Sequence, residues 1–309
     1  MYTAPPMFSL IVPARLCPRR VRSLVRVLAG QTYGDWEMLV AVDDDKTAEN
    51  IYRDAISMEP RARLAERNRW NTGPGAARND AVAQSRGRYI VMLDADDSLR
   101  KDYLGRFAEF FATHPHIKAA LAPTRIVLDA GPGLRKPLFV PNLAEGLKSP
   151  NGTLGVVTMA GYERLIVSTH VVCHSSVHLP WPENGFAEDV VRDARLVVQA
   201  KTVPVMDTEY LALIHRAQYT QSGHWSEEAI RASYVRTATQ YPELASMFLR
   251  RATANAYFAN NRRAGEDWYV FWSERHGEVP ELEELVGAEA PREDGGQAVA
   301  QVRSSTVDA

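Results

Sequence analysis

The segment Gly87-Arg-Tyr-Ile-Val-Met-Leu-Asp-Ala-Asp-Asp-Ser-Leu99 is the strongest structural signal in this sequence. Five apolar residues, Tyr89 to Leu93, are followed directly by three acids, Asp94, Asp96 and Asp97. A short apolar run bounded by glycine and polar residues is typical of a fully buried strand in a parallel sheet. Acids at its carboxyl end are then expected at the rim, where open α/β sheets bind their ligands.

Three carboxylates placed this closely repel one another unless a positive group lies between them. A hard divalent cation such as Mg²⁺ or Mn²⁺ can fill that role, held by one or two carboxylates together with substrate phosphates. The alternative is a solvated acidic turn after a strand. The Asp-x-Asp pattern alone favours this alternative, so the rest of the chain has to decide between the two.

The overall composition is that of a soluble globular protein. The chain has 309 residues, of which 45% are hydrophobic and 24% charged, enough for one large domain or two small ones. The net charge of −2 gives no support to nucleic-acid binding. Cys17 and Cys173 have neither metal-site spacing nor a disulfide pattern. With no apolar run long enough for a membrane helix and no signal-peptide pattern, we expect a cytoplasmic protein.

Strand and helix patterns alternate through the first third of the chain. Phe8 to Val12 is predicted to be a strand stopped by Pro13, and Val21 to Gly30 a helix with apolar residues on one face. Trp36 to Val42 is a second buried strand, and it too ends in acids, Asp43, Asp44 and Asp45. Further helices are expected near Ile51, between Pro74 and Gly87, and from Leu99 to Phe111. The pattern predicts a mainly parallel sheet covered on both faces, with both acid clusters facing one crevice.

The second half of the sequence is less regular. Residues 130–161 are rich in glycine and proline and are predicted to be a long loop. A helix is expected from Asp189 to Ala200, and helices again from Ser226 to His276. The segment from Glu278 to Ala309 carries eight acids and two arginines without periodicity, so it is predicted to be a mostly disordered tail.

Five segments in order resemble the family-2 glycosyltransferases, which have the GT-A fold. They are Phe8-Ser-Leu-Ile-Val-Pro13, Gln31-Thr-Tyr-Gly-Asp-Trp-Glu-Met-Leu-Val-Ala-Val-Asp-Asp44, Asn71-Thr-Gly-Pro-Gly-Ala-Ala-Arg-Asn79, Asp94-Ala-Asp-Asp97 and Phe186-Ala-Glu-Asp189. Each motif is weak alone, but five in order at suitable spacing make a specific pattern. The resemblance implies a mostly parallel, Rossmann-like α/β fold over residues 1–225. A helical extension over 226–276 and an acidic tail over 277–309 would follow.

Two departures from the family pattern lie close to the expected nucleotide base. Ala14-Arg15-Leu16 follows the first strand where the family often has Thr-Tyr-Asn, and Asp45-Lys46 replaces the usual Gly-Ser. The segment Gln221-Ser-Gly-His224-Trp225 resembles the Gln-x-x-Arg-Trp of processive synthases with histidine for arginine. Those enzymes usually carry membrane helices, so the sequence favours a transferase that adds a single sugar. The implied donor is a UDP-sugar of the GlcNAc, Glc or Gal type, with Mn²⁺ or Mg²⁺ as cofactor.

The resemblance assigns roles at the metal and the nucleotide. Asp96 is the first expected metal ligand, Asp94 the second and His224 the third. Asp94 is also expected to contact ribose or metal-bound water, and the adjacent Ala95 to contact the donor. Asp97 contacts the sugar or caps the next helix. Asp44 accepts a hydrogen bond from uracil or caps the helix at Lys46. The remaining expected contacts with the donor are Pro13, Arg15, Arg78, Asn79 and Trp225.

Some of these residues have equally plausible structural roles. Arg78 and Asn79 begin a helix after a glycine-rich turn, where phosphate binds readily, but an arginine there also pairs with surface acids. His215, Arg216, His224 and Trp225 follow later in the chain. Trp225 could stack on a sugar, and His215 or His224 could be a third metal ligand or contact the diphosphate. His170, His174 and His178 are spaced by four residues, yet their apolar neighbours predict a strand, so we interpret them as structural or acceptor-lining.

The general base is expected in the acid pair Glu188-Asp189. The resemblance implies Asp189 as the base, with Glu188 orienting groups or binding sugar, while the alternative is a helix start decorated with acids. A single displacement assisted by one carboxylate would invert the anomeric centre. The alternative functions are a nucleotidyltransferase of related fold and a non-catalytic module that binds sugar-nucleotides or glycans. The expected partners are a glycan, lipid-linked or small-molecule acceptor, a membrane surface, and a second copy paired through the C-terminal helices.

Overall fold

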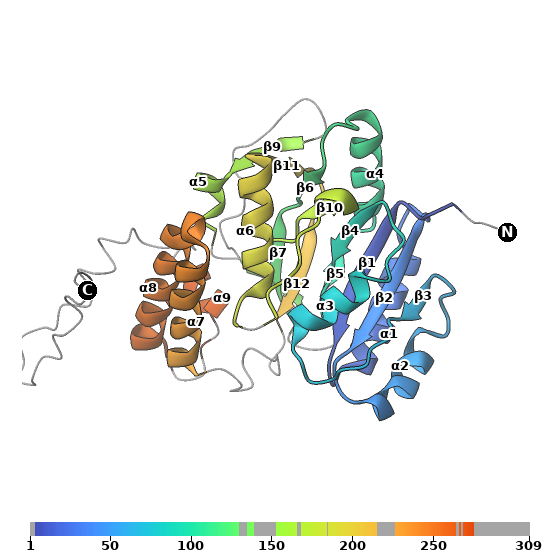
Figure 1. Cartoon of the computed structure of the whole chain (residues 1–309), viewed down its shortest axis with the longest axis horizontal. Helices are drawn as coiled ribbons and strands as arrows, with labels where there is room; N and C mark the ends of the chain where they lie inside the picture. The colour runs from blue at the N-terminus through green and yellow to red at the C-terminus, as the bar shows by residue number, and fades with distance from the viewer. Residues whose placement is uncertain are drawn as a thin grey trace, which may run out of the picture.

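A computed structural model describes residues 4–129, 135–138, 153–165, 168–183, 185–214, 226–263, 266 and 268–274. Within this part of the chain a six-stranded sheet has the order β3-β2-β1-β4-β10-β6 (Figure 1). Strands β1 to β4 run parallel, whereas β10 is antiparallel to both of its neighbours. The bounds are β1 Phe8–Ala14, β2 Trp36–Val42, β3 Ala62–Leu64, β4 Tyr89–Met92, β6 Ala119–Ala120 and β10 Val172–His174.

Helices cover both faces of this sheet, as the alternation of strands and helices predicted. Leu10 and Val91 pack on one face with the helices α1, α2 and α4. Ile11 and Ile90, their neighbours along the strands, pack on the other face with α3 and α6. The bounds are α1 Pro18–Ala29, α2 Glu49–Ile56, α3 Pro74–Val82, α4 Tyr103–Thr113 and α6 Glu188–Ala200. The alternation of side chains along each strand therefore fills two cores at once.

The carboxyl ends of β2 and β4 lie at the same edge of the sheet, because β1 pairs in parallel with both strands. The acids that follow each strand therefore emerge on one side, as predicted. The exact run Trp36–Val42 is a strand, and every one of its residues is buried.

The roles predicted for Pro13 and Gly87 from the sequence are wrong. Strand β1 continues through Pro13 to Ala14. Pro13 has no N–H to donate, but β4 has already ended beside it, since Leu93 makes the last bond of that ladder to Ile11. Gly87 does not end helix α3, which stops at Val82; it packs against the backbone of Phe8 and Ser9.

The segment predicted as a long loop contains regular structure among its described residues. Strand β9 pairs antiparallel with β11, and α5 follows it. A second sheet has the order β5-β12-β7-β8, so Leu99 belongs to a strand and not to the helix predicted there. The bounds are β5 Ser98–Leu99, β7 Thr124–Asp129, β8 Arg135–Pro137, β9 Thr153–Thr158, α5 Met159–Tyr162, β11 Thr202–Met206 and β12 Tyr210–Ile214.

The C-terminal helices pack at the opposite end of the molecule from the N-terminus (Figure 1). They are α7 Glu227–Gln240, α8 Ala245–Asn261 and α9 Trp268–Glu274, and short 3₁₀ turns occur at Lys46–Ala48, Ser175–Val177 and Pro242–Leu244. The predicted tail, 277–309, lies outside the described residues. Over the residues that are described, no helix combines the length and apolar character needed to span a membrane.

Candidate active site

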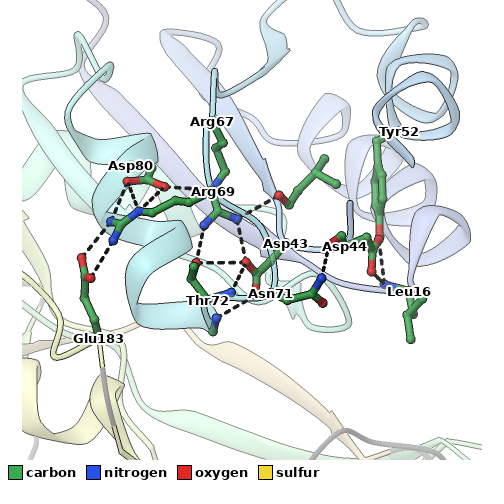
Figure 2. A network of polar contacts seen from close by, with 12 residues as sticks. Leu16, Asp43, Asp44, Tyr52, Arg67, Arg69, Asn71, Thr72, Asp80 and Glu183 are labelled. Atoms are coloured by element: carbon green, nitrogen blue, oxygen red, sulfur yellow. Dashed lines mark hydrogen bonds and ion pairs between the residues drawn. The ribbon is translucent and has the colours of Figure 1, made fainter. Parts of the chain in front are cut away.

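Asp43 is the anchor of the loop that follows β2 (Figure 2). Its buried carboxylate accepts hydrogen bonds from the backbone N–H groups of Thr72, at 3.0 Å, and Gly73, at 2.9 Å. Arg67 donates to the same carboxylate at 2.9 Å. These bonds fix the glycine-rich turn at the start of α3, so Asp43 positions the backbone there.

Asp44 occupies the end of β2 next to the end of β1. Its carboxylate accepts the N–H of Leu16, at 2.8 Å, and the hydroxyl of Tyr52, at 2.9 Å (Figure 2). The alternative of a helix cap is wrong, because Asp45 caps the turn at Lys46 through the N–H groups of Thr47 and Ala48. Asp44 instead shapes the β1–α1 loop, where base recognition was predicted.

Polar side chains, Arg69 and Asn79, connect helix α3 to the loop that leads into α6. Arg69 pairs with Asp80, at 2.8 Å, and with Glu183, at 2.7 Å (Figure 2). Asn79 both donates to and accepts from the backbone of Trp181, each at 2.9 Å. Asn79, predicted to bind phosphate, therefore clamps this loop in the structure.

Arg78 joins the two predicted halves of the site. Its buried guanidinium donates to Asp94 at 2.7 Å and to Glu188 at 2.6 Å. Sequence analysis left open whether Arg78 binds phosphate or pairs with acids, and the structure shows the ion pairs. Asp94 follows β4 and Glu188 begins α6. Arg78 therefore holds the turn after β4, which contains the expected metal ligands, beside the start of α6, which contains the candidate base.

Asp189 lies next to Glu188 in the first turn of α6 and is partly exposed. The preceding residue, Ala187, has φ of 63°, a left-handed conformation uncommon for a residue other than glycine. Such strain is maintained only where the surroundings fix the backbone, and it occurs often at functional sites. Here the N–H of Phe186 donates to Ser233 of α7, at 2.8 Å, which holds the turn in place.

The turn after β4, residues 94–97, directs its acids in different directions. Asp96 pairs with Arg20 at 2.8 Å. Asp97 accepts the hydroxyl of Tyr210 at 2.7 Å and the N–H of Leu213 at 2.9 Å. Asp97 is therefore not a helix cap, since α4 begins only at Tyr103; it connects the turn to β12.

His170 is part of this site, although the sequence analysis interpreted it as structural or acceptor-lining. It is 3% exposed, and its ring stacks on Tyr210 with centroids 3.6 Å apart and planes at 9°. Among the described residues, neither ring nitrogen has a hydrogen-bond partner. Its spacing of four residues from His174 was the signal in the sequence, but the strand-like apolar neighbours led to the interpretation as structural or acceptor-lining.

The charges of the site shift the pKa values of its members in opposite directions. Burial alone would raise the pKa of Asp94, but the charge of Arg78, the neighbouring His170 and the hydrogen bond from Arg78 together outweigh it and hold that pKa below its usual value. Burial, then the charges of Asp96 and Asp94, raise the pKa of Asp97 well above its usual value. Burial lowers the pKa of His170 to about 4, so its neutral form predominates near pH 7. Burial also raises the pKa of Glu188.

The side chains present fit a divalent cation. Asp94, Asp97 and His170 each offer one ligand atom, and these three atoms lie within 4.8 Å of one another. Carboxylates suit Mg²⁺ and Mn²⁺, and a neutral imidazole favours a transition metal over Mg²⁺. The predicted ligand Asp96 lies outside this group and pairs with Arg20.

The remaining predicted residues are distributed as follows. Pro13 and Arg15 lie at the end of β1 and just beyond it, close to Asp44, and Ala95 is buried within the β4 turn. His215, Arg216, His224 and Trp225 lie outside the described residues. His174 lies in strand β10, as predicted, whereas His178 follows the short turn after it, and neither belongs to the group of Asp94, Asp97 and His170.

With this geometry established, the chain can be assigned to a family. The model for "Glycosyl transferase family 2" matches residues 9–166, about half of the chain, and the chain belongs to that family. This agrees with the resemblance carried by the five motifs.

Individual relatives are similar over part of their length. The putative teichuronic acid biosynthesis glycosyltransferase TuaG of Bacillus subtilis is 31% identical over 34% of this chain and 42% of its own. The β-1,3-glucosyltransferase WfgD of Escherichia coli is 31% identical over 29% and 35%. The chain thus spans less than half the length of these curated relatives.

Solved structures share the fold. A crystal structure of residues 1–349 of Staphylococcus aureus TarS in complex with UDP-GlcNAc matches 91% of this chain and 81% of its own. Its TM-score is 0.58 at 19% identity. A Pyrobaculum calidifontis mannosyltransferase in complex with GDP-Man and Mn²⁺ matches with a TM-score of 0.52 at 15% identity. These likenesses confirm the GT-A architecture predicted from the sequence.

Proposed function

We propose that this protein transfers a single sugar from a UDP-sugar to an acceptor hydroxyl, with inversion at the anomeric carbon. The observation that carries the proposal is the double ion pair of Arg78 with Asp94 and Glu188. These ion pairs bring the acids after β4 beside the start of α6. The acids after β4 are suited to bind a donor diphosphate with its cation, and the acids at the start of α6 are suited to act as a general base. A module that only binds sugar-nucleotides has no need of the second group.

The base in this proposal is Asp189. Glu188 is occupied by Arg78, whereas no hydrogen bond within the described residues engages the Asp189 carboxylate. A carboxylate on the acceptor side takes the proton from the attacking hydroxyl as the new glycosidic bond forms and the bond to the diphosphate breaks. One displacement assisted by one base inverts the configuration.

The donor pocket is proposed at the ends of β1 and β2. Pro13, Arg15 and Asp44 line the place for the base, and Asp94, Ala95 and Asp96 the place for ribose and diphosphate. The UDP-GlcNAc held by the structurally similar TarS and the UDP-Glc named for WfgD support a UDP-sugar. A bound Mn²⁺ or Mg²⁺ would neutralise charge on the leaving diphosphate, and Trp225 and His224 are proposed to complete the pocket.

Replacement of the base tests the proposal. Asp189→Asn keeps the shape but removes the proton acceptor, so turnover should fall about 10²–10⁴-fold. The affinity for UDP should hardly change, because the base does not hold the nucleotide. UDP release over a panel of UDP-sugars and acceptors, with Mn²⁺ present and then removed by EDTA, measures both donor choice and metal dependence.

Glu188→Gln is the matched control, and its effect on turnover should be milder. The product linkage, read from NMR coupling constants, should be inverted relative to the donor. Near-normal turnover of Asp189→Asn, a retained configuration, or full activity in EDTA would each contradict the corresponding part of the proposal.

A further inference from the structure

We propose that the imidazole of His170 is a direct ligand of a divalent cation, together with the carboxylates of Asp94 and Asp97. Asp94 and Asp97 lie in the turn after β4, whereas His170 lies in the segment before β10, far along the chain. Their ligand atoms nevertheless lie within 4.8 Å of one another. The protein thus brings two oxygens and one nitrogen to a single point beside the candidate base.

The state of the His170 side chain is the independent observation that points to a ligand. The residue is 3% exposed, and both of its ring nitrogens are buried with no hydrogen-bond partner in the part of the chain that the structure describes. Buried polar groups in folded proteins nearly always have a partner, and an exception calls for an explanation. A cation between His170 and the two carboxylates gives one ring nitrogen its partner.

Tyr210 orients all three proposed ligands. Its ring stacks on the His170 ring, with centroids 3.6 Å apart. Its hydroxyl accepts the N–H of Asp94, at 3.1 Å, and donates to the carboxylate of Asp97, at 2.7 Å. Groups that hold metal ligands in this way fix their orientation and tune their affinity. A chance meeting of two acids and a histidine would have no such common support.

The carboxylates keep capacity for a cation despite their existing bonds. Asp97 accepts one hydrogen bond at each oxygen, and Asp94 accepts Arg78 at one oxygen. An ionised carboxylate has about four lone-pair positions, so both acids retain free ones. In their ionised forms Asp94, Asp96 and Asp97 bring three negative charges, faced by Arg78 and Arg20. A cation reduces the repulsion that remains among them.

This inference rests on the proposed function only for what the cation does in the reaction. The resemblance to the family placed the imidazole ligand at His224, whereas the described structure offers His170. Nitrogen coordination separates the two cases, and it can be measured with Mn²⁺ alone, without donor or acceptor.

The test is Mn²⁺ binding to the whole protein, followed by electron paramagnetic resonance. Titration of free Mn²⁺ gives the affinity, and electron spin-echo envelope modulation detects a ¹⁴N nucleus coordinated to the ion. Wild type should show imidazole ¹⁴N modulation. His170→Phe keeps an aromatic ring on Tyr210 and should lose that modulation, with affinity reduced about 10–100-fold.

Two other histidine variants complete the experiment. His174→Phe, at the far end of β10, should keep both the modulation and the affinity. Loss of the modulation in His224→Phe but not in His170→Phe would overturn the proposal, as would its absence in wild type. Circular dichroism verifies folding, and His170→Gln replaces His170→Phe if the latter does not fold. Intact Mn²⁺ binding without UDP release would leave this site standing and count against the proposed reaction.

Discussion

At the scale of single residues, burial separates two arginines that otherwise look alike. Arg78 and Arg69 each bridge two acids, but the side chain of Arg78 is 4% exposed and that of Arg69 is 38% exposed. Exposed ion pairs contribute little because water and salt screen them. Loss of Arg78 would leave the Glu188 side chain, which is 13% exposed, as a largely buried charge without its partner, while the Asp94 side chain is 32% exposed.

Arg78→Ala should therefore lower the free energy of unfolding by about 3–5 kcal/mol. Arg69→Ala, the matched control, should lower it by about 1 kcal/mol or less. Urea denaturation of both variants at neutral pH measures the difference. Equal losses would show that the Arg78 pairs contribute no more than surface contacts.

His178 makes stability depend on pH. Burial, and then the neighbouring charge of Arg192, lower the pKa of His178 from 6.5 to about 3. The unfolded chain therefore binds this proton between these pH values when the folded chain does not, and stability falls as pH drops below 6.5. The His178 ring lies against Trp181, with ring centroids 5.0 Å apart, so His178→Phe keeps an aromatic ring there and removes the titration. Its melting temperature should fall less between pH 7 and pH 5 than that of wild type, and parallel falls would contradict this.

At the scale of elements, the sequence predicted those whose own pattern is strong. Strand β2 was predicted to the residue, because an apolar run ending in acids is a local signal. Strand β9 was missed, because glycine and proline surround it and its partner β11 lies far along the chain. The side-chain partners in the site were missed for the same reason. Glu188 and Asp94 were predicted singly, but their connection through Arg78 depends on tertiary packing.

The junction of β1 with β4 depends on Gly87. A Cβ at this position would lie within 2.6 Å of the Phe8 carbonyl carbon, and backbone cannot move aside cheaply. Gly87→Ala should therefore lower the free energy of unfolding by about 1–3 kcal/mol. Gly34→Ala is the control, since the nearest group there is the end of the Arg61 side chain at 3.7 Å. Chemical denaturation should separate the two variants, and similar stabilities would refute the close approach.

At the scale of the whole molecule, the C-terminal helices share a core with the α/β sheet. Met247 and Phe248 of α8 are fully buried in the same hydrophobic cluster as Val190 of α6 and Ile90 of β4. The boundary at residue 225 between a transferase domain and a helical extension stays a prediction. The hydrophobic core extends across that boundary. Ser233 of α7 also supports the turn before Asp189. We therefore expect loss of the helices to disturb the active site.

A single substitution in α8 tests whether the chain unfolds as one unit. Phe248 is fully buried and contacts Tyr234 of α7, with ring centroids 5.9 Å apart. Phe248→Ala should cost about 3–5 kcal/mol, because it removes apolar contacts and leaves a cavity. Leu249, its neighbour, is 43% exposed, so Leu249→Ala should cost far less. Since the core is continuous, tryptophan fluorescence and far-UV circular dichroism should report one urea transition that shifts as a whole in Phe248→Ala. Two transitions, with only one of them shifted, would mean that the helices form a separate unit that the sheet does not need.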